Sequence, residues 1–468
     1  MFSFISEIHL IKTSRGGILF HTPSYSLIEM SPLMYDIFVS LKQRGDIEDV
    51  LSDFLVPKQE VVEMIEHIQK LLERSVPTST QHKISFFNKL KSKSIYRITL
   101  HVSNDCNLRC KYCYAAGGNY RMERTLMTME TAKKFVDFCL ENFTSISVIV
   151  FFGGEPFLNL PVIEYICKEI TQAYKSGKID YCPSFGAVSN GTILNDQLVK
   201  IVGEYFSFIT VSIDGPKEIN DYNRIDLLGN GSYDRISNFI RTIKSKTKVR
   251  IGFEATYTEE HISKGYTHSL LSKFINEEFG ISGVVTDEIT LLHNYSGSQD
   301  LKIDEEVQKE LEEICFPEGF WSVFYSIVLQ EPKKFCQIVR EIVSISVNGD
   351  IYPCHMDNGL KEHCLGNITG ENIFNNGCFD YIQNLQLLEI IDNKKRLCGD
   401  CWAINICAGC TRKWFYKDGT YQLQPSKELC ISNKKHLEKI LRIIVDIRKN
   451  KQLWEQLCDK YKDYEIRE

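Results

Sequence analysis

Three cysteines stand within eight residues in the stretch Cys106-Asn107-Leu108-Arg109-Cys110-Lys111-Tyr112-Cys113, and an aromatic ring directly precedes the third. Three thiolates at this spacing can hold three corners of an iron–sulfur cube, which normally takes four protein ligands. The iron without a protein ligand is then open to a small molecule, to which it can pass an electron. Structural zinc is the alternative, but zinc usually takes four ligands from paired knuckles, and no local fourth ligand is present.

The composition is that of a globular protein with several domains. Of the 468 residues, 25% are charged and 43% are hydrophobic, and the formal net charge of -6 argues against nucleic acid as a partner. No apolar run approaches the roughly 18 residues of a membrane span. Residues 1–10 have neither the basic flank nor the cleavage site of a secretory signal. We therefore expect a cytoplasmic protein without a membrane partner.

The 17 cysteines are unevenly placed along the chain. None precedes Cys106, and five fall between Cys398 and Cys430. The cytoplasm keeps thiols reduced, so a disulfide framework is not expected there. Clusters of this kind indicate metal ligation.

Residues 1–80 have the pattern of three strands followed by three helices. The strands are expected at 7–12, 17–20 and 24–29, and the helices at 33–43, 46–54 and 58–74. Ser31-Pro32 supplies a cap and a first-turn proline for the first helix. Residues 81–94 are polar and basic and are interpreted as a linker.

From residue 95 the pattern alternates between strand and helix. Strands are predicted at 98–102, 148–152, 185–189, 208–213, 249–257 and 283–291, with helices at 128–142, 160–174, 196–205 and 233–244. This alternation predicts an α/β fold with a parallel sheet. Six such units over residues 95–309 fit a partial TIM-like (β/α)6 barrel, and an open doubly wound sheet is the alternative. Ligands bind at the carboxyl ends of the strands in both, and Cys106 follows the first strand directly.

Polar motifs follow the next three strands. The Gly153-Gly154-Glu155-Pro156 run lets a ligand approach the backbone, and its carboxylate and carbonyls can take an ammonium group. Ser189-Asn190-Gly191 and Ser212-Ile213-Asp214-Gly215 end the third and fourth strands, and Arg224 supplies a fork for a carboxylate. Ordinary turn chemistry is the alternative for each motif alone, but their order favours one ligand site.

The cysteine spacing and the Gly-Gly-Glu-Pro run resemble the signature of the radical S-adenosylmethionine (SAM) superfamily. The resemblance implies a [4Fe-4S] cluster on Cys106, Cys110 and Cys113, whose open iron chelates the amino and carboxylate groups of SAM. One electron then cleaves SAM to methionine and a 5′-deoxyadenosyl radical. The cofactor-binding residues implied by the resemblance, together with the aromatic of the cysteine motif, are Tyr112, Gly153, Gly154, Glu155, Ser189, Asn190, Ser212, Asp214 and Arg224.

The later cysteines, in residues 310–435, resemble the Cys-rich SPASM extension of radical SAM peptide maturases. The resemblance assigns one auxiliary [4Fe-4S] cluster to Cys398, Cys401, Cys407 and Cys430, and three corners of another to Cys336, Cys354 and Cys410. The chain would thus hold three clusters. Two residues rather than three separate Cys407 from Cys410, which departs from the SPASM pattern. We favour an open iron in the second auxiliary cluster, although Cys315 or Cys364 could close it.

The segment that follows Cys354 contains two candidate catalytic groups. His355 or Asp357 could accept the thiol proton of a substrate, and a surface or supporting role is the alternative for both. Residues 436–468 are expected to form a C-terminal helix that packs on the barrel.

Residues 1–80 resemble the precursor-recognition element of peptide-modifying enzymes, a winged-helix-like module. The resemblance implies that the leader of a ribosomal precursor peptide adds as a strand to the sheet edge. The whole chain resembles sactipeptide and ranthipeptide synthases, which form thioether crosslinks, and it would take electrons from an external flavodoxin- or ferredoxin-type donor. The alternatives are formylglycine formation by an anaerobic sulfatase maturase, carbon–carbon crosslinking, and a non-enzymatic redox sensor or zinc-binding adaptor.

Overall fold

The computed structural model divides the chain into two compact units. The terminal unit comprises Met1–Ile84, His293–Cys336 and Glu389–Glu468, and the barrel unit comprises Ser85–Leu292 and Gln337–Leu388. The structure describes residues 3–51, 53–54, 56–75, 94–287, 320–332, 336, 338–339, 341–370, 374–375, 378–379, 390, 397–407, 409–417 and 419–465. Of the expected linker, 81–94, only Ser94 is among the described residues. Cys315 lies outside them.

The barrel unit is built on six parallel strands that neighbour one another in the order of the sequence. They are β4 (Ser94–Ser103), β5 (Ser145–Gly153), β6 (Ser184–Ser189), β7 (Phe206–Ser212), β8 (Arg250–Tyr257) and β9 (Ser282–Asp287). An open doubly wound sheet reverses its strand order at a switch point, and this sheet does not. The predicted partial barrel is therefore confirmed.

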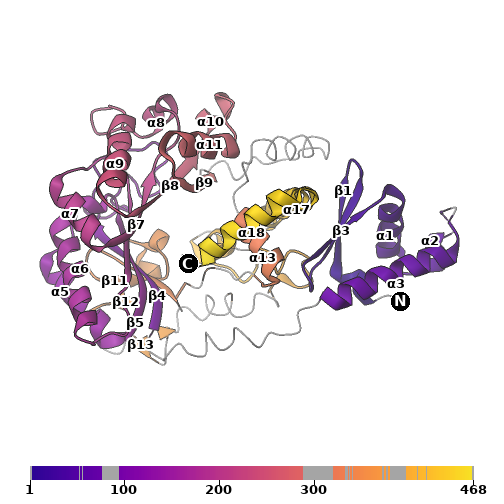
Figure 1. Ribbon diagram of the computed structural model, residues 1–468. Coiled ribbons are helices and arrows are strands. Elements are labelled where there is room, and N and C mark those ends of the chain that lie inside the picture. Colours follow the sequence, from indigo (N-terminus) through magenta and orange to yellow (C-terminus); the bar gives the residue numbers. More distant parts are fainter. Residues whose placement is uncertain are drawn as a thin grey trace. The chain divides into compact units, whose positions relative to one another are not determined.

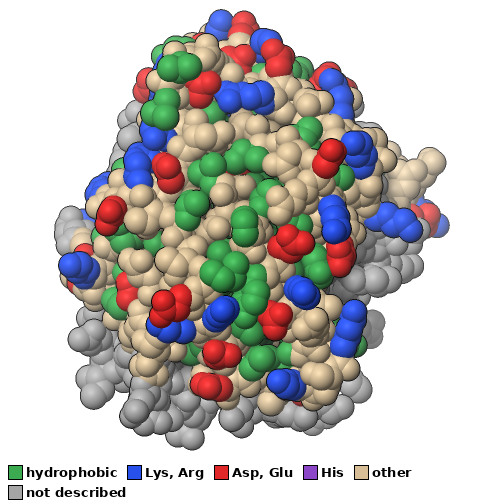
Figure 2. All heavy atoms as spheres, turned by 90° about the vertical axis from the view of Figure 1, so that its left-hand side faces the viewer, with side chains coloured by type: hydrophobic (Ala, Val, Ile, Leu, Met, Phe, Trp, Pro, Cys, Tyr) green, Lys and Arg blue, Asp and Glu red, His purple; other side chains and the backbone are tan. Residues whose placement is uncertain are grey.

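Helices connect these strands and cover one side of the sheet (Figure 1). They are α5 (Met129–Asn142), α6 (Leu160–Lys175), α7 (Asp196–Tyr205), α8 (Lys217–Asn223), α9 (Tyr233–Lys246), α10 (Glu259–Ser263) and α11 (His268–Phe279), with the 3-10 turn η2 (Pro156–Asn159) before α6. Side-chain caps fix where α5 and α7 begin: Thr128 accepts from the N–H of Thr131, and Asn195 from that of Leu198. The outer helical face carries acidic and basic side chains in an interspersed pattern (Figure 2).

A second sheet segment, which the sequence reading missed, extends the barrel sheet beyond β4. β10 (Ile342–Ile345) pairs in parallel with β4, and β11 (Asp350–Tyr352) and β12 (Gly366–Asn367) follow in antiparallel order. Cys354 comes shortly after β11, at the start of the turn η4 (His355–Asp357), and η5 (Lys361–His363) lies before β12. The candidate residues His355 and Asp357 thus belong to the barrel unit. A small hairpin, β13 (Phe374–Asn375) and β14 (Cys378–Phe379), comes later in the same unit.

The N-terminal module has the three strands and three helices expected from the sequence. The turn η1 (Ser3–Glu7) leads into β1 (Ile8–Thr13), β2 (Gly16–His21) and β3 (Ser26–Met30), which pair antiparallel in that order. The helices are α1 (Pro32–Arg44), α2 (Ile47–Leu51) and α3 (Lys58–Ser75). Ser31 caps α1 as predicted, since its side chain accepts from the N–H of Met34. Leu19 and Met30 of the sheet share a buried core with Phe38 and Ile65 of the helices.

The second face of this sheet packs against helices from the far end of the chain. These are α13 (Phe320–Leu329), α17 (Lys427–Lys449) and α18 (Lys451–Glu465). Ile11 and Phe20 lie in one buried cluster with Phe324 of α13 and Ile444 of α17, and the buried Arg442 donates to the carbonyl of Lys12 at 2.6 Å. Within the terminal unit, the N-terminal module covers the buried face of α17, and the expected packing of the C-terminal helix on the barrel stays a prediction.

Before α17, the described residues between 397 and 426 contain three short elements. They are α16 (Thr411–Phe415), β15 (Tyr416–Lys417) and β16 (Thr420–Tyr421). Across the described parts of both units, no helix has the length and apolar character that a membrane crossing requires.

Candidate active site

The structure brings the predicted SAM-site residues of the barrel unit together at the carboxyl ends of β4 to β7. The amide nitrogen of Asn190, after β6, lies 3.5 Å from Sγ of Cys106, after β4. Glu155, after β5, contacts Ser189 of β6. Tyr112 of the cysteine loop contacts Asp214, after β7. Four strand ends that are distant in the sequence therefore meet at one site.

The three cysteines of the loop fit an iron–sulfur cluster. Sγ of Cys106 accepts from the N–H of Leu108 at 3.4 Å in addition to the Asn190 contact. Hydrogen bonds to the cysteine sulfurs are one of the ways in which proteins set the reduction potential of an iron–sulfur cluster. Burial, with help from the nearby Glu155 charge, raises the pKa of the Cys106 thiol to about 12, and burial also raises the pKa of Cys110. Burial thus makes it unfavourable to ionise these thiols. Cationic iron would offset this effect, because it favours the thiolate form.

Two glycines allow the segments around the cluster loop to approach closely. Gly118 has φ +91°, and a Cβ there would lie 2.6 Å from Cβ of Cys106 and 2.8 Å from Cα of Gly154. A Cβ on Gly154 would lie 2.2 Å from the carbonyl oxygen of Asp105. Any larger residue at either position would push the cysteine loop away from the end of β5.

The backbone of the cysteine loop is hydrogen-bonded to the segment that follows α8. Arg109 N–H donates to the carbonyl of Ile225 at 2.6 Å, and Lys111 N–H to that of Asn223 at 3.0 Å. Leu108 and Asp226 form an isolated antiparallel bridge. These backbone contacts hold the cysteine loop against the end of α8 and the residues after it.

Glu155 is a buried carboxylate that ties two strand ends together. Its Oε1 accepts from the hydroxyl of Ser189 at 2.9 Å and from the N–H of Phe157 at 3.1 Å, and its Oε2 accepts from the N–H of Asn190 at 2.7 Å. Burial raises its pKa to about 7 against these hydrogen bonds. The expected contact of Glu155 with an ammonium group stays a prediction, whereas the structure shows it joining β5 to β6.

Tyr112, Asp214 and Arg224 form a buried triad. The Tyr112 hydroxyl donates to Oδ2 of Asp214 at 2.7 Å and accepts from Nη1 of Arg224 at 2.5 Å. Burial raises the pKa of Asp214, although the Arg224 charge opposes the shift. Nε of Arg224 is buried and has no hydrogen-bond partner among the residues that the structure describes. An unpaired donor on a buried guanidinium fits the predicted role of Arg224, which is to bind the SAM carboxylate.

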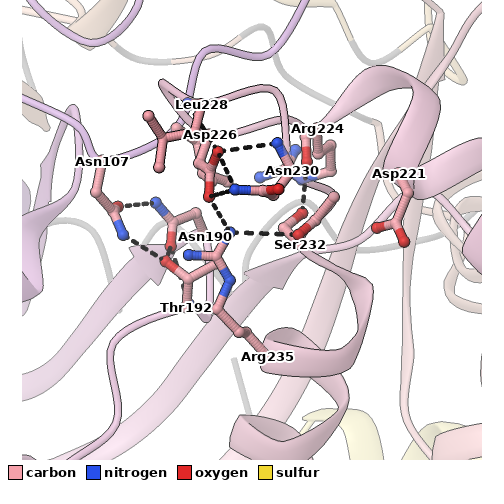
Figure 3. A network of polar contacts seen from close by, with 12 residues as sticks. Asn107, Asn190, Thr192, Asp221, Arg224, Asp226, Leu228, Asn230, Ser232 and Arg235 are labelled. Atoms are coloured by element: carbon pink, nitrogen blue, oxygen red, sulfur yellow. Dashed lines mark hydrogen bonds and ion pairs between the residues drawn. The ribbon is translucent and has the colours of Figure 1, made fainter.

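Asn107 and Thr192 are site residues that the sequence reading missed. Nδ2 of Asn190 donates to Oδ1 of Asn107 at 2.9 Å, Nδ2 of Asn107 donates to Thr192 at 2.8 Å, and Thr192 donates back to Asn190 at 2.6 Å (Figure 3). The triangle links the cysteine loop to the end of β6. Its only sequence signal was the position of both residues next to recognised motifs.

The two proposed proton acceptors have different surroundings. Asp357 is fully buried, and its Oδ1 lies 3.0 Å from Nδ1 of His363, another residue that the sequence reading missed. Nδ1 of His355 lies 3.8 Å from Sγ of Cys354, and its ring lies 4.9 Å from that of Phe152. The geometry therefore favours His355 as the acceptor and gives Asp357 a role in holding His363.

The auxiliary cysteines of the terminal unit form two groups. The charges of Cys398 and Cys401 act on the thiol of Cys430, whose pKa is raised first by burial, and Nδ2 of Asn433, in the next turn of α17, lies 3.5 Å from Sγ of Cys407. These four cysteines are the ones assigned to one cluster.

The second group contains Cys336 and Cys410. The N–H of Cys336 donates to the carbonyl of Gly409 at 3.0 Å, and the Cys336 carbonyl accepts from the hydroxyl of Thr411 at 2.9 Å, so the backbones at 336 and 410 are close. The thiol of Cys364, in the barrel unit, donates to the carbonyl of Gly366 at 3.3 Å.

No group of three or more His, Cys, Asp or Glu side chains within the described residues is arranged to hold a single metal ion. An iron–sulfur cube makes a different demand, because each thiolate ligates a different iron.

Comparisons with known proteins agree with the site. Residues 100–262 match the model of the radical SAM superfamily, and residues 336–402 match that of the SPASM iron–sulfur cluster-binding domain. An uncharacterized protein of Methanocaldococcus jannaschii is 29% identical over 285 residues, which are 59% of this chain and 89% of that protein. The radical SAM cyclopropyl synthase TigE of Paramaledivibacter caminithermalis is 23% identical over 430 residues, 84% of this chain and 85% of TigE.

Solved structures share the fold. Native anSMEcpe with bound AdoMet has a TM-score of 0.59 at 19% sequence identity and covers 76% of this chain and 99% of its own. Residues 100–262, which match the radical SAM model, include the cysteine loop, the Gly-Gly-Glu-Pro turn and the buried triad. The structure brings all three to one edge of the sheet. The chain therefore contains a radical SAM domain over residues 100–262 and a SPASM iron–sulfur cluster-binding domain over residues 336–402.

Proposed function

We propose that this enzyme forms thioether crosslinks, from a cysteine sulfur to a carbon atom, in a ribosomally made precursor peptide. The observation that carries the peptide part is a cavity of about 330 Å³ beside β3 and α3 of the N-terminal module. The thioether part rests on the auxiliary cysteines, of which Cys336, Cys354 and Cys410 would leave one iron open to a substrate thiolate.

The cavity has the features that binding of an added strand requires. Within the described residues β3 pairs with β2 alone, so its other edge can take a peptide strand. Leu27 of β3, Leu71 of α3 and Ile327 of α13 give the cavity apolar walls, and Arg448 of α17 adds a cation. A leader that alternates apolar side chains and carries an acidic residue would fit these walls.

The residues at the barrel edge would each have a defined task. Cys106, Cys110 and Cys113 would hold the cluster, whose electron cleaves SAM to the hydrogen-abstracting 5′-deoxyadenosyl radical. Arg224 would bind the SAM carboxylate through its unpaired Nε, and Asp214 would hold Arg224 and the Tyr112 ring in place. His355 would accept the proton of the substrate thiol, as its position beside Cys354 suggests.

Mass spectrometry can test the chemistry directly. The full-length enzyme with SAM and dithionite is incubated with peptides encoded by short reading frames beside its gene. Each thioether removes two hydrogen atoms and protects one cysteine from iodoacetamide. Loss of two hydrogens with the thiol still reactive would instead indicate a carbon–carbon bond, and conversion of a cysteine or serine to an aldehyde would indicate formylglycine. Either result contradicts the thioether proposal.

Cyclopropane formation is a second candidate. It is favoured by the match to the cyclopropyl synthase TigE, which extends over 84% of this chain. A cyclopropane also removes two hydrogens but needs no cysteine. A Cys-to-Ser precursor would therefore still be modified under this alternative, whereas under the thioether proposal it would remain unchanged.

Leader binding is tested by Leu71→Glu, which places a charge on the exposed side of the cavity. Loss of one buried leucine contact predicts a weakening of peptide affinity by roughly tenfold or more in a fluorescence-anisotropy titration. Leu33→Glu on α1, which is similarly exposed and does not line the cavity, is the matched control. Equal affinities in both variants would remove the cavity from the proposal. A point variant is preferable to deletion of residues 1–80, because Ile11 and Phe20 cover the buried face of α17.

A further inference from the structure

The loop between α8 and α9 holds two leucines in water. The side chains of Leu227 and Leu228 are 67% and 87% exposed, the largest fractions among the described exposed aliphatic residues. Tyr222, at the end of α8, is 50% exposed. An exposed apolar group on an ordered loop is a common mark of a contact surface.

Hydrogen bonds and an ion pair within the loop hold these leucines in their exposed positions. Oδ1 of Asp226 accepts from the N–H groups of Leu228 and Asn230, both at 2.9 Å, and Oδ2 of Asp226 pairs with Arg235 at 3.2 Å (Figure 3). The hydroxyl of Ser232 donates to the carbonyl of Arg224 at 2.7 Å, which closes the base of the loop. The protein therefore uses its polar contacts to hold the leucines outward.

This loop is continuous with the loop that carries Cys106, Cys110 and Cys113. Leu108 pairs with Asp226, only two residues before Leu228, and Arg109 donates to Ile225. Nζ of Lys111 lies 3.0 Å from the centre of the Tyr222 ring. The leucines, Tyr222 and Lys111 thus belong to the surface next to the predicted cluster.

Cations outnumber carboxylates along residues 105–124, although the whole chain carries a formal net charge of -6. Arg109 and Arg124 share one carboxylate, that of Asp105, at 4.0 and 2.6 Å. Lys111 pairs with no carboxylate among the described residues. A cationic rim around an apolar tip complements an acidic protein that exposes an apolar edge.

We propose that Leu227, Leu228, Tyr222 and Lys111 form the docking surface for a small acidic flavoprotein of the flavodoxin class. The leucines would contact the apolar edge of the exposed flavin ring, and the cations would contact the acidic residues around it. One electron leaves the reduced flavin and is accepted at the cluster held by the adjacent cysteines, and no other bond forms or breaks in this step. The inference rests on the radical SAM part of the proposed function and not on the type of crosslink.

The double substitution Leu227→Ser and Leu228→Ser tests the docking surface. Reduced flavodoxin should drive formation of 5′-deoxyadenosine with a KM raised roughly tenfold and an unchanged kcat, because two apolar contacts are lost. Labelled flavodoxin should bind the variant with a Kd raised by a similar factor, which is a readout independent of activity. Dithionite, which needs no docking, should give the wild-type rate.

The matched control is Tyr181→Ser. Tyr181 is also 67% exposed, but it lies in the connection leading into β6, at the opposite end of the strands from the cluster. This variant should match the wild type with both reductants.

Several results would overturn the proposal. An unchanged flavodoxin KM and Kd would do so, as would a defect seen with a ferredoxin but not with flavodoxin. An equal loss with dithionite would show that the leucines support the SAM site itself. Normal cleavage of SAM with both reductants but impaired peptide modification would assign the leucines to the peptide. Because the assay follows SAM cleavage without peptide, it reports on docking even if the thioether proposal fails.

Discussion

The two cysteine regions of the molecule differ in how much of their surroundings is independent of iron. The loop with Cys106, Cys110 and Cys113 sits between the long strands of a barrel and is hydrogen-bonded to the segment after α8. Among the described residues between 397 and 426, the auxiliary cysteines at 398–410 lie near short elements, of which the five-residue helix α16 is the longest. We therefore expect the first site to keep its structure without iron, and we expect the second site to need its cluster in order to fold fully.

The largest effect is expected at the first region. The triple variant Cys106→Ala, Cys110→Ala and Cys113→Ala should lose reductive cleavage of SAM entirely while keeping about eight irons, those of two clusters. Its thermal midpoint should stay near that of the wild type, because the loop keeps its backbone contacts. Iron analysis, product chromatography and circular dichroism provide the measurements. A collapse in stability would show that iron forms this site as well.

Removal of the auxiliary ligands should have the opposite pattern. Cys398→Ala with Cys401→Ala should cost about four irons and lower the thermal midpoint by roughly 5 °C or more, because ligation energy contributes to folding at this site. The spectrum of the SAM-bound cluster should persist. Cys182→Ala, which removes an exposed cysteine elsewhere, is the control. If the variant lost the expected iron but kept its thermal midpoint, the proposed difference between the two cysteine regions would be contradicted.

A smaller effect tests the buried triad of the first region. Arg224→Lys keeps the charge but removes the Nη1 donor to Tyr112 and the Nε that would reach the SAM carboxylate. A hydrogen bond to a charged group contributes about 1.5–3 kcal/mol. The Kd of SAM should rise roughly tenfold to a hundredfold in equilibrium dialysis. Arg235→Lys, in the first turn of α9, should change this Kd by less than about twofold. Similar values for the two variants would deny Arg224 a role in SAM binding.

The last test concerns pH. Glu155 has its pKa raised by burial to about 7, so the folded protein binds its proton more tightly than the unfolded chain does. This contribution to stability is present below about pH 4.5 and is lost as the pH rises through 7, a change of about 3 kcal/mol for the raised pKa. Glu155→Gln should flatten the pH dependence of urea unfolding over this range, whereas Glu141→Gln on the exposed side of α5 should not. Parallel curves for wild type and Glu155→Gln would show that the carboxyl titrates normally.

Much of the barrel could be predicted because its signals are local. The period of each strand and helix extends over only a few residues, and so does the Ser31 cap that was predicted in the N-terminal module. The pairing of β10 with β4 could not be predicted, because a four-residue strand has no readable period and its partner lies more than two hundred residues away.

Parts of the site could not be predicted for the same reason, because they depend on contacts between segments that are distant in the sequence. Asp357 read as a candidate base, yet its neighbour proved to be His363, and nothing in the spacing reveals which charges face each other. Glu155 read as a ligand-binding carboxylate, yet its oxygens accept from three protein groups. Sequence motifs locate chemistry along the chain, but the hydrogen-bond partners depend on contacts between distant strands.

The contact between the N-terminal sheet and α17 has a consequence for how the protein is made. Arg442 and Lys12 are separated by 430 positions, so the ribosome releases β1 to β3 long before it has synthesised the helix that covers Ile11, Ile18 and Phe20. Until then this apolar sheet face is open to water, to chaperones or to a neighbouring nascent chain. A module that leaves the ribosome before α17 is therefore unable to finish folding until α17 has been made.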